Sequence, residues 1–137
     1  MRTLKMVYTL WKMLGESNGD EINTRSINMS IWNCQKYGAM EEYNFVPIQD
    51  GPLSNEILAD VSFLEMFGII KIQNSYLKLN GFEDIDSLIE ESKSSYPSEI
   101  ETIDTVIDEM KEKDLFVDEK KIIHYWKGEL GELDISF

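Results

Sequence analysis

Side chains that could do catalytic chemistry are scarce in this sequence of 137 residues. Cys34 is the only cysteine and His124 the only histidine. A nucleophilic cysteine needs an adjacent base, and a structural zinc site needs four ligands, mostly nitrogen or sulfur. Cys34 stands at helical spacing with Ile27 and Ile31 and is therefore interpreted as a small buried apolar residue. His124 follows two isoleucines and is interpreted as a half-buried packing residue.

The carboxylates are the more abundant candidates. Glu101, Asp104, Asp108 and Glu112 recur at intervals of three and four residues, which places them on one face of a helix. That face is either a docking ridge for a basic protein surface or the ordinary solvated side of a helix in an acidic protein. The spacing alone leaves both interpretations open.

Other motifs of catalytic or ligand-binding sites are absent from the sequence. There is no phosphate-binding loop, no dinucleotide fingerprint and no calcium-loop spacing. We therefore expect no catalytic, cofactor-binding or metal-binding residues, and a protein that is not an enzyme.

Two amphipathic helices are predicted in the first 40 residues. Apolar residues of the first recur at helical spacing: Leu4, Val7, Trp11 and Leu14. The second can be capped by Asn23 or Thr24 and ends at Gly38.

A third helix followed by a β-hairpin is predicted between residues 54 and 79. Ser54 is the expected N-cap, and Gly68 is expected just past the last turn. Its predicted apolar face consists of Ile57, Leu58, Val61 and Leu64. Residues 69–72 and 76–79 are the expected strands. Three helices and a small β-hairpin in this order predict a mainly α fold of the α+β class, a winged helix-turn-helix.

Residues 3–81 resemble the YwgA-like winged-helix proteins of bacteria and archaea. The resemblance is carried by residues 43–47, the Gly51-Pro52-Leu53-Ser54 segment and the end of the third helix at residues 64–70. The chain is also similar, more distantly, to the Panacea antitoxin domain, which has a comparable Gly-Pro segment. Leu53 stands where the family usually has an aromatic residue, and only Arg25 and Lys36 are basic in the second helix. The resemblance implies a winged-helix fold and provides no catalytic residues.

Negative charge is concentrated behind this region. The net charge is −13, with five basic and three acidic residues in 1–40, two and six in 41–80, and six and seventeen in 81–137. Residues 1–81 are therefore interpreted as a winged-helix domain, and residues 82–137 as an acidic helical extension that packs on it or on a dimer mate.

Several helices are predicted in the extension. Pro97 is expected in the first turn of a long helix, Ser98 and Glu101 have capping-box spacing, and Asp118 is the expected cap of a last helix. Residues 128–137 are expected to be a strand or a frayed tail.

These patterns favour a protein partner. The third helix carries Glu56, Asp60 and Glu65 and no Lys or Arg, which opposes contact with DNA phosphates. We therefore expect a non-catalytic interaction module, antitoxin-like or an inhibitor from a phage or other mobile element, that masks a basic surface of its partner protein. Its expected binding residues are these three and the four of the Glu101–Glu112 series.

The alternative is a dimeric DNA-binding regulator that uses Arg25, Lys71 and Lys78. Nucleic acid is the less favoured ligand, and a homodimer is left open. One cysteine, no apolar run of membrane-spanning length and no signal-like start favour a cytoplasmic protein without membrane association.

Overall fold

The computed structural model describes residues 2–16, 22–40, 43–74, 76–79, 85–116 and 118–133. Within these ranges the chain forms six α-helices and five short strands, so the fold is mainly helical with a small amount of antiparallel sheet. The predicted α+β class is confirmed at that level. The elements are α1 (Arg2–Glu16), β1 (Ile22–Asn23), α2 (Thr24–Lys36), β2 (Val46–Ile48), β3 (Gly51–Leu53), α3 (Asn55–Met66), β4 (Ile70–Gln73), β5 (Tyr76–Leu79), α4 (Ile85–Ser95), α5 (Pro97–Glu112) and α6 (Glu119–Glu132).

The sheets contain more strands than the sequence predicts. The expected hairpin of β4 and β5 is present, but β1 also pairs with β5, which gives a three-stranded sheet of order β1-β5-β4. A second hairpin, β2 with β3, lies between α2 and α3. Strands of two or three residues contain too little alternation to show in a sequence pattern.

Most predicted helix boundaries follow from local caps. The Asn23 side chain accepts a hydrogen bond of 2.8 Å from the Arg25 N–H, and the Ser54 hydroxyl accepts one of 3.3 Å from the Ile57 N–H. Asp118 likewise accepts from two backbone N–H groups at the start of α6. Gly38 and Gly68 follow α2 and α3 with φ of +85° and +75°, a left-handed conformation that favours glycine.

Three local predictions are wrong. Leu58 does not belong to the buried face of α3, because its side chain is 60% exposed. Ser98 does not cap α5: the helix already begins at Pro97, and its N-cap residue Tyr96 makes no side-chain capping bond. Residues 128–132 are neither strand nor tail, because α6 continues to Glu132; residues 134–137 lie outside the described part.

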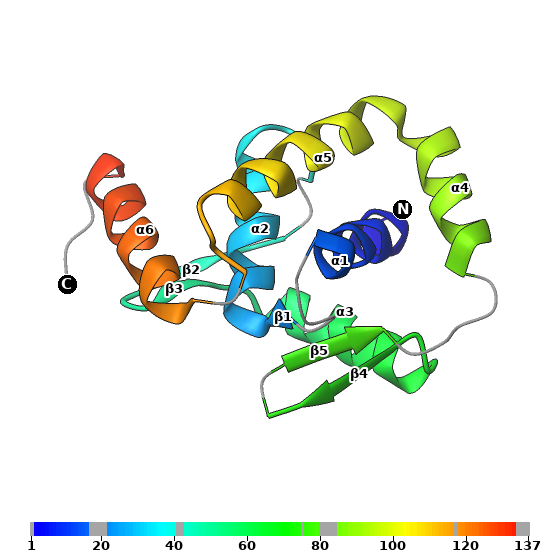
Figure 1. Cartoon of the computed structure of the whole chain (residues 1–137), viewed down its shortest axis with the longest axis horizontal. Coiled ribbons are helices and arrows are strands. Elements are labelled where there is room, and N and C mark those ends of the chain that lie inside the picture. Colours follow the sequence, from blue (N-terminus) through cyan, green and yellow to red (C-terminus); the bar gives the residue numbers. More distant parts are fainter. Residues whose placement is uncertain are drawn as a thin grey trace.

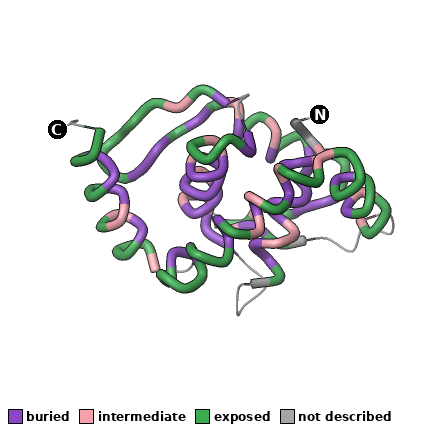
Figure 2. Tube along the Cα trace, turned by 90° about the horizontal axis from the view of Figure 1, so that it is seen from above, coloured by how far each residue is buried: buried purple, intermediate pink, exposed green. Residues whose placement is uncertain are grey.

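The core is one hydrophobic cluster that joins the front and back of the chain. Helix α2 lies at the centre, α4 and α5 curve around α1, and α6 lies beside the β2–β3 hairpin (Figure 1). Buried residues follow the inward sides of these elements and exposed residues follow the outside (Figure 2). The C-terminal helices therefore pack on α1, α2 and β3 of the same chain.

Polar contacts reinforce this packing. The Ser26 hydroxyl lies 2.8 Å from the Leu115 carbonyl, and the Lys36 ammonium lies 3.0 Å from a carboxylate oxygen of Glu129. The Trp126 indole N–H donates to the Ile48 carbonyl at 2.7 Å, while its ring meets Trp32 edge-on at 5.2 Å between centroids. These contacts hold α5 and α6 in place relative to α2.

Candidate functional site

The predicted acidic series on α5 is divided between two surroundings. Asp104 faces α1, where the Tyr8 hydroxyl donates to it at 2.5 Å, and Asp108 forms an ion pair of 3.5 Å with Lys12. Glu101 and Glu112 are exposed on the outer side of the helix, and so is the neighbouring Glu109. Only part of the series is therefore exposed without a contact to α1. We refer to Glu101, Glu109 and Glu112 as the acidic face of α5.

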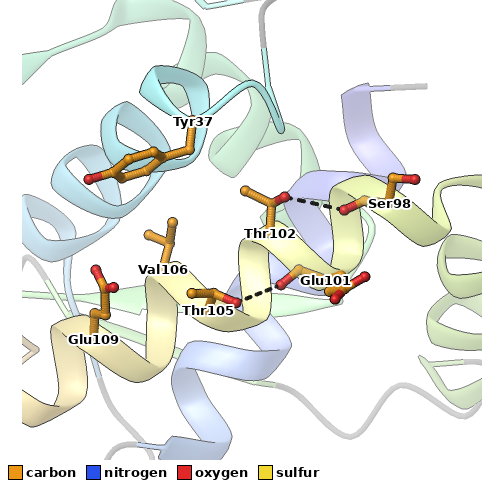
Figure 3. A pocket seen from close by; sticks show the side chains of 7 residues that line it. All are labelled: Tyr37, Ser98, Glu101, Thr102, Thr105, Val106 and Glu109. Atoms are coloured by element: carbon orange, nitrogen blue, oxygen red, sulfur yellow. Dashed lines mark hydrogen bonds between the residues drawn. The ribbon is translucent and has the colours of Figure 1, made fainter.

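A hollow of about 570 Å³ lies beside this face. Tyr37, at the end of α2, borders it on one side, and residues of α5 form the rest (Figure 3). The lining residues are Tyr37, Ser98, Glu101, Thr102, Thr105, Val106 and Glu109. We call this the Tyr37 hollow. Tyr37 and the two threonines were not predicted as site residues, because the hollow exists only where the end of α2 meets α5.

Hydrogen-bond acceptors dominate the polar lining. The Thr102 hydroxyl donates to the Ser98 carbonyl at 3.3 Å, and the Thr105 hydroxyl donates to the Glu101 carbonyl at 3.1 Å (Figure 3). Each threonine proton is thereby used within the helix, while the oxygen keeps accepting capacity. Together with the Glu101 and Glu109 carboxylates, this lining suits ammonium or guanidinium donors.

The three carboxylates of α3, which are predicted binding residues, have contacts within the chain. Each accepts a hydrogen bond from a neighbouring segment of the same chain. The donors are the Asn44 N–H to Glu56 at 2.7 Å, the Tyr43 hydroxyl to Asp60 at 2.5 Å, and the Ile72 N–H to Glu65 at 2.8 Å. These acids fasten α3 to the preceding loop and to β4.

The two predicted acidic groups do not form one surface. In Figure 1, α5 lies at the top of the molecule and α3 at the bottom, with α1 and α2 between them. A partner that covers the acidic face of α5 therefore does not also cover α3.

The predicted basic residues are likewise divided. Arg25 forms ion pairs of 3.7 Å with Asp50 and 3.6 Å with Glu119, so its charge is already balanced within the fold. Lys71 and Lys78 are exposed and stand directly opposite each other on the β4–β5 ribbon. Like charges in that position repel each other. Of the three predicted basic residues, the two on this ribbon therefore form its exposed basic surface.

The two chemically reactive side chains differ in environment. Cys34 is fully buried, and burial raises the pKa of its thiol to about 12, which suppresses the reactive thiolate. His124 lies exposed on α6, so its predicted half-buried position is wrong. Within the described ranges, no three His, Cys, Asp or Glu side chains are grouped so that they could hold a metal ion.

In the part of the chain that the structure describes, no helix combines the length and apolar character needed to cross a bilayer. Comparison of the chain with protein-family models, with curated proteins and with solved structures found no match.

Proposed function

We propose that this protein is a non-catalytic protein-interaction module that binds a basic surface of a partner protein through the acidic face of α5. One observation carries the proposal: the exposed carboxylates of Glu101 and Glu109 border the Tyr37 hollow, whose other polar groups also accept hydrogen bonds. Lysine and arginine side chains supply positively charged donors that match these carboxylates.

The charge distribution supports this kind of partner. Residues 81–137, which include α5, carry seventeen acidic and six basic residues and are the most acidic part of the sequence. Such a concentration of negative charge accelerates association with a basic protein. It disfavours association with acidic proteins and with nucleic acid.

We further propose a winged helix-turn-helix for residues 1–81, with residues 82–137 as its helical extension. The order α1-β1-α2-α3-β4-β5, with the β2–β3 hairpin inserted between α2 and α3, and the sheet order β1-β5-β4 support this, with the β4–β5 ribbon as the wing. The resemblance to YwgA-like and Panacea antitoxin domains favours an inhibitory or antitoxin-like role. In that role the module would occupy and mask the basic site of its target.

The test is affinity capture from a nuclease-treated lysate of the source organism, with the full chain as bait. We expect a protein retained by the wild type to bind about tenfold or more weakly to the Glu101→Lys/Glu109→Lys/Glu112→Lys variant, because attraction to its basic groups becomes repulsion. Affinities are then measured with the purified partner by isothermal titration calorimetry.

The matched control reverses two exposed acids on α4, in the Asp86→Lys/Glu91→Lys variant. This control changes net charge in the same direction and should keep most of the affinity. Equal affinity of the wild type and the α5 variant would show that the acidic face of α5 is not the binding surface.

DNA binding as a dimeric regulator is the second candidate. It is favoured by the opposed Lys71 and Lys78 on the β4–β5 ribbon and opposed by the ion pairs that occupy Arg25. If lysate without nuclease treatment yields only nuclease-sensitive nucleic acid, this candidate replaces the first.

A further inference from the structure

The outward surface of α3 has a composition unusual for a helix exposed to water. Leu58, Phe63, Met66 and the adjoining Phe67 are 60%, 50%, 84% and 62% exposed. The Phe63 and Phe67 rings already contact each other, with centroids 4.6 Å apart. We call these four residues the apolar face of α3. Contiguous exposed apolar patches mark interaction sites more often than isolated exposed residues do.

Charge is displaced from the middle of this face. At 100° per residue, Ala59, Ser62 and Met66 occupy the outermost line of the helix, between Leu58 on one flank and Phe63 on the other. The helix contains no Lys or Arg, and its three carboxylates are held by hydrogen bonds to neighbouring segments. The small side chains of Ala59 and Ser62 allow another helix to approach closely.

We propose that the apolar face of α3 is the interface of a homodimer, in which it packs against the same face of a second copy. A two-fold axis brings identical patches together, so the protruding Met66 of one copy can lie against the small Ala59 and Ser62 of the other. This inference does not depend on the proposed function of α5.

The exposed area of the apolar face is close to what such a contact needs. A phenylalanine side chain buries on the order of 200 Å² when it is fully covered. The four residues, each half or more exposed, therefore offer roughly 400–500 Å² per copy on that scale, and two copies approach the ~1,000 Å² of a specific interface. An adjoining groove of about 290 Å³, lined by Leu53, Leu58 and Ile72 among others, extends the apolar surface.

The distribution of charge favours a second copy over the basic partner of α5. The four residues of the apolar face carry no charge, so they offer a basic protein no ion pair, whereas the same four residues of a second copy can cover them. Two copies with net charge −13 repel each other over the rest of their surfaces, but α5 lies on the opposite side of the molecule from α3 (Figure 1). Contact through α3 therefore keeps the acidic faces of α5 apart, and salt weakens the repulsion between distant charges.

The experiment is sedimentation velocity of the full chain over a concentration series up to about 100 µM. We expect the wild type to reach twice the monomer mass, and Met66→Glu to raise the dimer dissociation constant at least about tenfold. Met66 is 84% exposed, so this change should leave the monomer fold intact; circular dichroism checks that.

Val46→Glu is the matched control, because Val46 is a 60% exposed apolar residue on β2, outside the apolar face. It should dimerise like the wild type. A wild type that remains monomeric at every concentration overturns the proposal, and so does a dimer that Met66→Glu leaves unchanged or that Val46→Glu weakens equally.

Discussion

At the scale of single residues, the role of a carboxylate depends on the donors within its reach. Glu56, Asp60 and Glu65 suggest an acidic binding surface in the sequence, yet each bonds a donor of its own chain. Asp104 and Asp108 are similarly engaged by α1. Glu101, Glu109 and Glu112 have the same chemistry but face outward. Identical side chains are therefore structural at some positions and candidate binding groups at others.

The bond between Tyr43 and Asp60 should contribute measurably to stability. Tyr43 is 2% exposed, and its hydroxyl donates to the half-buried Asp60 carboxylate at 2.5 Å. We expect Tyr43→Phe to lower the free energy of unfolding by about 1–2 kcal/mol, because the carboxylate loses a charge-assisted bond. Urea unfolding followed by circular dichroism measures this.

The control is Tyr37→Phe, since Tyr37 is 59% exposed. It should change the free energy of unfolding by less than about 0.5 kcal/mol. If both variants lose the same stability, the Tyr43–Asp60 bond is not the cause.

At the scale of elements, helix ends are specified locally and hairpin partners are not. Asn23, Ser54 and Asp118 cap their helices through residues only two or three positions away. The β2–β3 hairpin is instead held from outside, because α6 packs against β3 and the Trp126 indole bonds the Ile48 carbonyl. A three-residue strand owes its order to such distant contacts.

Substitution of two glycines tests whether backbone conformation alone determines where a helix such as α3 ends. Gly68 has φ of +75° after α3, Gly128 lies inside α6, and an added Cβ would meet nothing within 4 Å at either position. We expect Gly68→Ala to cost about 1–2 kcal/mol, because alanine is strained in the left-handed region. Gly128→Ala should instead stabilise by up to about 1 kcal/mol through its helix propensity.

Thermal or urea unfolding compares the two glycine variants. Because open space surrounds both sites, opposite signs can arise only from the backbone. Two changes of the same sign would contradict this explanation of the α3 terminus.

At the scale of the whole molecule, two opposite surfaces differ in character. The α5 side carries exposed carboxylates and a hollow, and the α3 side carries exposed apolar residues. Because these surfaces do not overlap, one copy can use α3 for a second copy and α5 for a basic partner at the same time. Such a dimer presents two acidic faces, which raises avidity for a repeated or dimeric target.

Two tyrosines at contacts between helices, Tyr8 between α1 and α5 and Tyr125 between α6 and α2, limit stability at alkaline pH. Burial first, and then the negative charge of Glu129, raises the pKa of Tyr125 on α6 to about 12. Burial first, and then the hydrogen bond to Asp104, raises the pKa of Tyr8 on α1 as well. Both groups therefore keep their protons in the folded chain at pH values where an unfolded tyrosine, with a pKa of about 10, releases them.

The unfolded chain consequently binds fewer protons above pH 10, and the free energy of unfolding should fall as pH rises from 10 to 12. The stabilisation is fully present below pH 10. Tyr125→Phe should make this decline shallower, as measured by urea unfolding at a series of pH values. Parallel declines in the variant and the wild type would contradict the role of Tyr125.

Many features of this protein follow from local patterns in the sequence. The amphipathic helices, the caps at Asn23, Ser54 and Asp118, and the glycines that follow α2 and α3 depend on neighbours within about one turn, and the concentration of acidic residues after residue 80 depends on composition alone. These features can be predicted because local periodicity and capping act over short distances along the chain.

Which acids are engaged within the chain and which face outward depends on the folded arrangement. Tyr8 and Asp104 are 96 positions apart, and Lys36 and Glu129 are 93 apart, so no local pattern indicates these contacts. The same holds for β1 on β5, for Tyr37 beside α5, and for the exposure of Leu58 on α3. Hydrogen bonds and burial depend on distance in space, which the folded arrangement of the helices sets and the spacing of residues along the chain does not.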